Sequence, residues 1–212
     1  MRNIKFNKEI LKDEAQLKSG RKLPNDAVEV MQMGTLLHQI IPAVLFTSII
    51  ITTAGWFGTF LLKHSDKPAP EMDIFFALKL MVIFAIYFMI FPYIHELIHG
   101  MCYPSQAVKN VWKRPTSFFV YCEAQVSKKR MIVILIMPLF LLAVIPYIAW
   151  LWLLPELSAT MAYILLIADL YIVFTCISDI GAVWVIAKYV PRNAEVFSRG
   201  FKFYYRKTNR RS

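Results

Sequence analysis

Residues 74–102 read IFFALKLMVIFAIYFMIFPYIHELIHGMC, an apolar run in which Lys79 is the only lysine or arginine. A helix needs about 20 predominantly apolar residues to cross roughly 30 Å of hydrocarbon, and this run is long enough. Helices are favoured in lipid because they satisfy their backbone hydrogen bonds internally. The stretch therefore predicts a membrane-spanning helix.

Three further apolar stretches meet the same criterion. They run from about Leu36 to Leu62, from Met131 to Leu154 and from Met161 to Ala187. The chain is 58% hydrophobic and 18% charged, against about 45–50% and about 25% in soluble domains. Its 212 residues leave little room for a separate soluble domain, and its three cysteines include no CxxC pair and imply no disulfide framework. We predict an all-α fold, a polytopic bundle of four transmembrane helices.

The distribution of charge predicts the orientation of the chain. The net charge is +10, and lysine and arginine gather in residues 1–30, 103–130 and 188–212. The loop at 63–73 has two lysines balanced by three acidic residues, and the loop at 155–160 has no basic residue. Because cytoplasmic loops carry the excess of lysine and arginine, both termini are expected in the cytoplasm, in a multi-pass protein of the cell membrane.

The two tails are predicted to lie at the membrane surface rather than to fold. Residues 191–212 interleave aromatic and basic side chains, a pattern that also binds single-stranded nucleic acid by stacking. Directly after a span, the pattern is more typical of a segment on an anionic membrane. The predicted partner is therefore the lipid bilayer, with no nucleic acid. In the cytoplasmic or interfacial N-terminal tail, residues 1–30, Asn7 is expected to cap a helix from Lys8 to Ser19.

The segment His95-Glu96-Leu97-Ile98-His99 carries the predicted chemistry. Residues four apart share one helix face, so both imidazoles can reach one metal ion. This is the HExxH pattern, in which two histidines bind zinc and the glutamate is the general base. An ionised group at the centre of a membrane helix costs about 2.5–3.5 kcal/mol, and a divalent metal is a sufficient partner for it. Two alternatives stay open: a solvated interfacial cluster, and a metal site without turnover.

A catalytic zinc needs a third protein ligand and one open position. The candidates inside predicted spans are Asp169, Asp179 and His38. His95 lies about 12 Å from the cytoplasmic end of its span, and Asp179 lies at a similar depth in the last span. Asp169 lies about 15 Å further towards the outer face, and His38 belongs to the cytoplasmic boundary. We therefore predict Asp179 as the third ligand, and Asp169 as a packed polar residue and the next candidate.

Two prolines and one loop segment suggest an irregular structure near this depth. Pro92 precedes His95 by three residues, and Pro138 lies near the start of the third span. Kinks at both prolines are expected to open a water pocket around the metal, although proline is also common in ordinary membrane helices. Residues 116–122 are rich in β-branched and aromatic residues and predict a strand. As a hypothesis, this strand pairs with an extended substrate; the alternative is an interfacial loop anchored by aromatic residues.

At this point the chain resembles a known family. The HELIHG segment at residues 95–100 and the Ser178-Asp179-Ile180-Gly181 segment resemble small bacterial membrane proteins described as zincin peptidases, a family similar to the site-2 protease group. The resemblance covers about residues 30–205. It implies His95, His99 and Asp179 as zinc ligands, Glu96 as the catalytic base, and the bacterial cytoplasmic membrane as the location. Site-2 proteases usually carry Asn-Pro-Asp-Gly or Leu-Asp-Gly at the last ligand, and this chain has neither.

We therefore expect a four-helix membrane metalloprotease domain over residues 31–190, between the tail at 1–30 and a basic aromatic tail at 191–212. Its cofactor would be Zn²⁺, which two imidazoles and a carboxylate in a hydrolytic motif favour over iron or cobalt. Its substrate would be a membrane or membrane-adjacent protein or peptide. The alternatives are a pseudoprotease that binds metal and a client without cutting it, and a metal transporter. The transporter is disfavoured because the polar groups gather at one depth.

Overall fold

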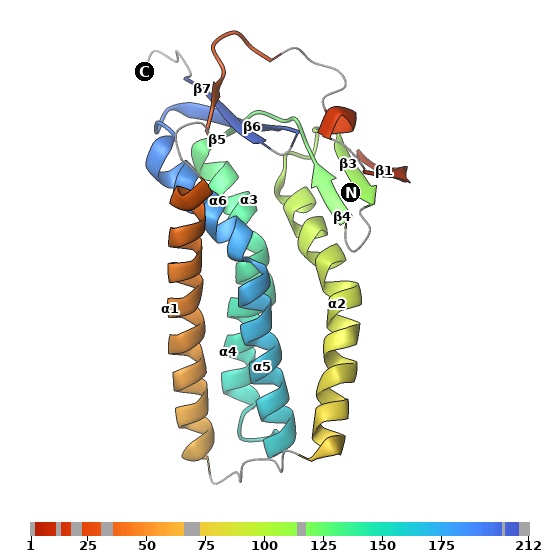
Figure 1. Ribbon diagram of the computed structural model, residues 1–212, viewed down its shortest axis with the longest axis vertical. Coiled ribbons are helices and arrows are strands. Elements are labelled where there is room, and N and C mark those ends of the chain that lie inside the picture. Colours follow the sequence, from red (N-terminus) through yellow and green to blue (C-terminus); the bar gives the residue numbers. More distant parts are fainter. Residues whose placement is uncertain are drawn as a thin grey trace.

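A computed structural model gives the fold. It describes residues 3–11, 14–17, 23–30, 36–65, 73–113, 118–200 and 202–207. Long helices run side by side, and the strands gather at one end of the bundle (Figure 1). The first and last strands, β1 and β7, both lie at this end.

The helical part contains the predicted spans. The helices are α1 (Leu36–Lys63), α2 (Ile74–Cys102), α3 (Lys128–Leu139), the π-helical segment η3 (Phe140–Val144), α4 (Ile145–Leu153), α5 (Ala159–Thr175) and α6 (Ile177–Tyr189). Three helical stretches are long and apolar enough to cross a membrane: Ile40–Lys63, Ile74–Cys102 and Lys128–Leu153. A fourth span results if α5 and α6, bent by 45° relative to each other, are taken as one. The prediction of an apolar helical bundle is confirmed at this level.

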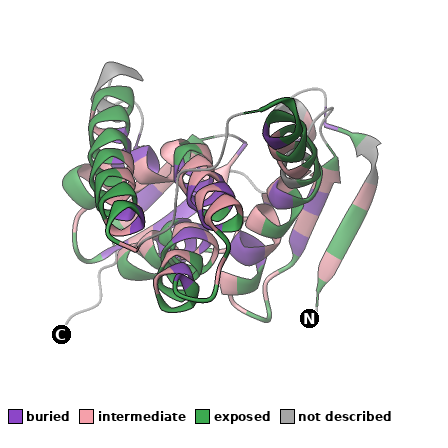
Figure 2. Cartoon of the chain, turned by 90° about the horizontal axis from the view of Figure 1, so that it is seen from below, coloured by how far each residue is buried: buried purple, intermediate pink, exposed green. Residues whose placement is uncertain are grey.

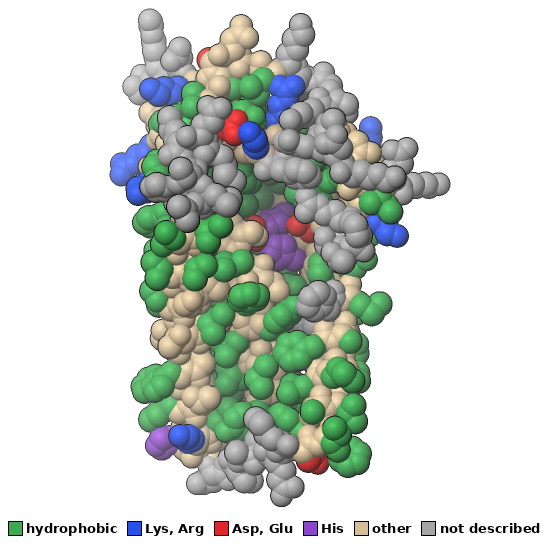
Figure 3. All heavy atoms as spheres, viewed as in Figure 1, with side chains coloured by type: hydrophobic (Ala, Val, Ile, Leu, Met, Phe, Trp, Pro, Cys, Tyr) green, Lys and Arg blue, Asp and Glu red, His purple; other side chains and the backbone are tan. Residues whose placement is uncertain are grey.

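The surface of the helical part is mostly apolar, which is consistent with a location in a membrane. Apolar side chains cover the helical part, whereas lysine and arginine gather at the end that carries the strands (Figure 3). Exposed residues lie on the outward faces of the helices and buried ones face the interior (Figure 2). Large side chains such as Trp56, Met89 and Trp152 are 67%, 72% and 83% exposed. Such an apolar belt stabilises the fold when lipid, rather than water, surrounds it.

The prediction of an all-α fold is wrong, because two small sheets cap the bundle. The strands are β1 (Ile4–Ile10), β2 (Val28–Glu29), β3 (Lys109–Lys113), β4 (Phe118–Tyr121), β5 (Val126–Ser127), β6 (Ala194–Arg199) and β7 (Lys202–Lys207). One sheet has the order β1-β3-β4, with β1 parallel to β3 and β4 antiparallel to it. The other has the order β2-β7-β6-β5 and is antiparallel throughout. The predicted strand is confirmed over Phe118–Tyr121; residues 116 and 117 lie outside the described residues.

Both tails therefore contribute strands instead of unfolded surface segments. The predicted helix from Lys8 is wrong at its start, because residues 4–10 pair with β3 and only a short 3-10 turn, Glu14–Leu17, follows. In the C-terminal tail, β6 and β7 form a hairpin that turns at Gly200, where φ is +63° and favours glycine. Pairing with neighbouring strands satisfies the backbone groups of these segments.

The main hydrophobic core lies where α3, α6 and the second sheet meet. Its most buried members include Met131 and Ile134 of α3, Ile186 of α6 and Val196 of β6, all at most 2% exposed. This core fixes the ends of the helices against the sheet. It lies close to the predicted metal site, because Ile134 contacts His99 directly through its carbonyl group.

The first turn of α3 binds the C-terminal ends of two other helices. The Nζ of Lys128 donates hydrogen bonds to the carbonyls of Ala187 and Val190 at the end of α6, at 2.8 and 2.6 Å. The Nε and Nη2 of Arg130 donate to the carbonyl of Cys102 at the end of α2, at 3.3 and 3.2 Å. The last carbonyls of a helix have no partner within it, and basic side chains commonly satisfy them. The helices that carry the predicted site are thus both tied to α3.

Candidate metal centre

The end of α2 presents two faces to its surroundings. His95 and His99 are four residues apart, so their rings lie one above the other, with centroids 4.8 Å apart. The Nε2 atoms of the two rings are 3.1 Å apart. Glu96 and Gly100, also four residues apart, face β4 instead, through contacts with Val120. One helical turn thus points its histidines to one side and its glutamate to another.

Asp179 reaches the histidines from α6. The helix is interrupted at Cys176, where α5 ends and α6 begins at an angle of 45°. Asp179 lies in the first turn of α6. Its Oδ2 lies 2.9 Å from Nε2 of His95 and 3.4 Å from Nε2 of His99. The potential ligand atoms of the three residues lie within 4.8 Å of one another. The first turn of a helix also favours a carboxylate because of its free N–H groups and its dipole.

Neighbouring groups orient the two imidazoles. Nδ1 of His99 lies 2.8 Å from the carbonyl oxygen of Ile134 on α3. A carbonyl only accepts hydrogen bonds, so Nδ1 carries the hydrogen and, in the neutral ring, Nε2 keeps its lone pair. Nδ1 of His95 lies 3.9 Å from Sγ of Cys176, a fully buried thiol at the break between α5 and α6. In metal sites, such contacts to the second ring nitrogen set the tautomer of the ligand.

These three residues fit a divalent metal ion. Asp179 Oδ2 is buried and has no hydrogen-bond partner, because its close contact with His95 lacks hydrogen-bond geometry. In a tetrahedral zinc site each donor points at the ion, and donor atoms lie about 3.3 Å apart for metal–ligand bonds of about 2.0–2.1 Å. The observed separations of 2.9, 3.1 and 3.4 Å are close to that value. Two imidazole nitrogens and one carboxylate oxygen are also a donor set that zinc accepts.

Glu96 is held beside this cluster by the edge of a sheet. Its Oε2 accepts a hydrogen bond of 2.9 Å from the backbone N–H of Val120 in β4. Gly100 favours the close approach of β4, because a Cβ on Gly100 would lie only 3.2 Å from Cγ1 of Val120. The strand and the glutamate are therefore positioned together.

Other residues considered from the sequence lie apart from the cluster. Asp169 is 7% exposed on α5, and its Oδ1 has no hydrogen-bond partner, but it does not belong to the group formed by the other three. Glu123 accepts a hydrogen bond from the hydroxyl of Tyr121. The side chain of His38 lies outside the described residues.

Sequence reasoning missed three groups at the site: the carbonyl of Ile134, the N–H of Val120 and the thiol of Cys176. Two of them are main-chain groups, which carry little information in the sequence because nearly every residue has them. Only the carbonyl of Ile134 could have been found from the sequence. Pro138, four residues later, cannot donate a hydrogen bond to it, which indicates that it is available to another donor.

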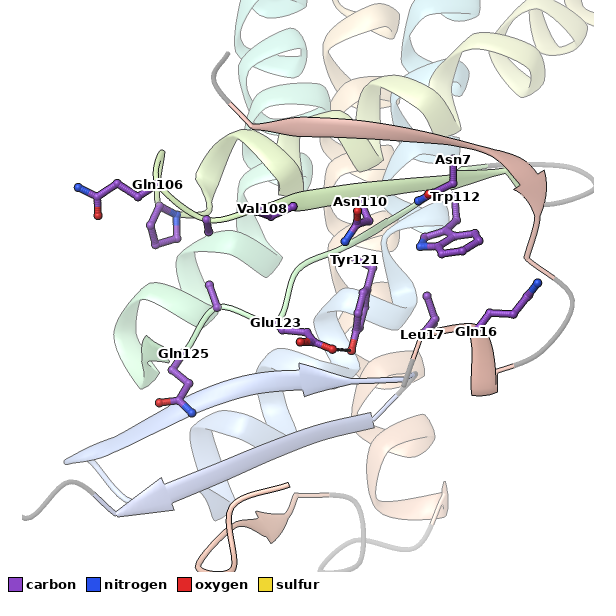
Figure 4. A pocket seen from close by; sticks show the side chains of 13 residues that line it. Asn7, Gln16, Leu17, Gln106, Val108, Asn110, Trp112, Tyr121, Glu123 and Gln125 are labelled. Atoms are coloured by element: carbon purple, nitrogen blue, oxygen red, sulfur yellow. Dashed lines mark hydrogen bonds between the residues drawn. The ribbon is translucent and has the colours of Figure 1, made fainter. Parts of the chain in front are cut away.

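A cavity lies away from the histidine cluster. It has a volume of about 830 Å³ and is lined mainly by polar side chains from the first sheet and the loops around it (Figure 4). Tyr121 and Trp112 border it, whereas Val120, the neighbour of Tyr121 in β4, contacts Glu96 and Gly100. Alternate residues of a strand point to opposite faces. The cavity and the histidine cluster therefore lie on opposite faces of this sheet. The cluster is favoured as the functional site because it brings two imidazoles and a carboxylate together.

A histidine pair four residues apart on a helix, with a carboxylate from a second helix, is the arrangement of zinc peptidases of the HExxH class. The chain belongs to the family described as "Putative zincin peptidase", whose match covers residues 88–194, from the middle of α2 to the start of β6. No curated protein and no solved structure matches the chain.

Proposed function

We propose that the protein is a membrane-embedded, zinc-dependent peptidase that hydrolyses peptide bonds of membrane or membrane-adjacent substrates. The observation that carries the proposal is the convergence of His95, His99 and Asp179 beside Glu96, at the end of an apolar helix. Membership of a family described as zincin peptidases supports it. The apolar surface of the helices supports a location in a membrane, and the proposed membrane is the bacterial cytoplasmic membrane.

His95, His99 and Asp179 would hold the metal, and Glu96 would handle the proton. Bound zinc polarises a carbonyl and lowers the pKa of a coordinated water to about 7. The Val120 N–H occupies Oε2 of Glu96, which leaves Oε1 to accept a proton from the attacking water. The oxygen of that water forms a bond to the carbonyl carbon. As the C–N bond breaks, Glu96 returns the proton to the leaving nitrogen.

The edge of β4 is the proposed docking site for the scissile segment. In the described part of the chain, β4 pairs with β3 on one side, and its other edge faces α2. An extended peptide can add to such an edge through main-chain hydrogen bonds. The N–H of Val120, which an added strand would use, now binds Glu96. Substrate docking would then compete with Oε2 of Glu96 for the N–H of Val120.

The test is cleavage of a mixed pool of membrane peptides by purified protein in detergent, followed by mass spectrometry. Cleavage by the wild type that disappears on chelation and returns with added zinc supports the proposal. Zinc binding without cleavage of any peptide would instead indicate a regulator that holds metal and a client. Uptake of zinc into sealed vesicles would indicate a transporter.

A further inference from the structure

The carbonyl of Ile134 does not accept the usual hydrogen bond from the residue four positions later in α3. In an α-helix each carbonyl accepts from the N–H four residues later. Four residues after Ile134 stands Pro138, which has no N–H and whose ring pushes against that carbonyl. Both residues are buried, Ile134 at 2% exposure. The carbonyl is thus free to bind a donor from outside α3.

That donor is Nδ1 of His99, at 2.8 Å. The contact decides which nitrogen of His99 carries the hydrogen, as argued above. It leaves the lone pair of Nε2 on the side of His95 and Asp179, at 3.1 and 3.4 Å. A free carbonyl on α3 therefore prepares one ligand of the cluster.

A second hydrogen bond between α3 and α2 helps to fix this contact. Arg130, Ile134 and Pro138 are spaced four residues apart and share one face of α3. Arg130 binds the carbonyl of Cys102 at the end of α2, and Ile134 binds His99, three residues before Cys102. The two hydrogen bonds fix the last turn of α2 against α3.

We infer that Pro138 is a positioning residue for the metal site: by lacking an N–H, it keeps the Ile134 carbonyl available to orient His99. An N–H at position 138 would bind the same oxygen along the helix axis and draw it away from α2. Pro138 touches no metal ligand itself. It acts on His99 through the main chain of Ile134. The inference rests on the proposed metal site for its effect on zinc, but its effect on the tautomer of His99 does not require zinc.

The test compares two proteins that differ only in the group at position 138. One is Pro138→Ala, which restores the N–H. The other carries L-lactic acid at position 138, introduced by nonsense suppression, so that an ester oxygen replaces the N–H of alanine. Both lack the proline ring, so any loss of packing is common to them. Pro42→Ala, at the proline inside α1, is the control for removing a helix proline elsewhere.

Two measurements are made on each protein. Zinc affinity is measured by competition with a chromophoric chelator, and the tautomer of His99 in metal-free protein is measured by nitrogen-15 NMR. Groups that orient a ligand typically change metal affinity by about 10–100-fold. We expect Pro138→Ala to weaken zinc binding by about that factor and to lose the pure Nδ1–H tautomer. The lactic acid protein and Pro42→Ala should both resemble the wild type.

Equal zinc affinity and an equal tautomer in the alanine and lactic acid proteins would overturn the inference while leaving the metal site intact. A wild type that binds no zinc would overturn the proposed function. In that case the tautomer comparison still decides whether Pro138 orients His99.

Discussion

Oε2 of Glu96 accepts a hydrogen bond of 2.9 Å from the backbone N–H of Val120, which joins the predicted catalytic base to the edge strand β4. This relationship places the predicted base and β4, the proposed docking site of the substrate, on one side of α2. The histidines occupy the other side, towards α3 and α6. The division of roles around one helical turn leads to separate predictions for each face.

Replacement of the base should separate metal binding from turnover. Glu96→Gln removes the proton acceptor but keeps the size of the side chain and an oxygen that can accept from Val120. We expect unchanged zinc content and a fall in the rate of peptide cleavage of about 10²–10⁴-fold. Glu123→Gln, in the neighbouring loop, is the control and should keep its activity. Full activity of Glu96→Gln would remove this residue from the mechanism.

The close approach of β4 can be tested at Gly100. A Cβ there would lie 3.2 Å from Val120, so Gly100→Ala should displace β4 by a few tenths of an ångström. We expect full zinc content and a loss of cleavage rate of about tenfold, because catalysis is sensitive to small misplacements. Gly55→Ala is a matched control, since a Cβ on Gly55 of α1 would be similarly crowded, 3.3 Å from Cδ1 of Leu170 on α5. Equal rates for the two variants would argue against a role for β4.

The contacts of Lys128 predict an effect on stability. Its ammonium group binds two carbonyls at the end of α6, and Lys128→Met would leave both without this partner. We expect a loss of about 1 kcal/mol, or roughly 2–4 °C in the unfolding midpoint for a chain of this size. The measurement is thermal unfolding in detergent, followed by circular dichroism. Lys129→Met, at the exposed neighbouring position, should unfold within 1 °C or so of the wild type.

The orientation in the membrane is a separate prediction. The excess of basic residues predicts that the end with the strands is cytoplasmic. Alkaline phosphatase, which folds only outside the cytoplasm, should be inactive when fused after β7 and active when inserted after Ser65, in the first loop. The reverse pattern would place the predicted metal site near the outer face.

The helices were readable from the sequence because each is a long local pattern. The stretch from Ile74 to Cys102 has the same bounds in the structure as in the prediction. The pairing of His95 with His99 is also local, since it follows from helical periodicity. The proximity of Asp179 to the histidines was predicted by comparing how far each residue lies from the cytoplasmic end of its span. This comparison is possible because spanning helices cross the same thickness of hydrocarbon.

The strands of the tails and the environment of the ligands were not readable in this way. Residues 4–10 mix apolar and polar side chains, and their conformation depends on β3, which begins at Lys109, far along the chain. Strand formation of this kind is set by tertiary contacts rather than by intrinsic preference. The carbonyl of Ile134 and the N–H of Val120 are main-chain groups, and only the fold determines which of them meet His99 and Glu96.

The most direct test of the metal site is the metal content of detergent-purified protein, measured by inductively coupled plasma mass spectrometry. The variants are His95→Ala, Asp179→Asn and, as a control for a buried aspartate on the neighbouring helix, Asp169→Asn. We predict about one zinc ion per chain in the wild type and in Asp169→Asn, and loss of zinc in the other two. Zinc retained in Asp179→Asn but lost in Asp169→Asn would contradict the proposed ligand set, and a wild type without metal after incubation with zinc would contradict the proposed function itself.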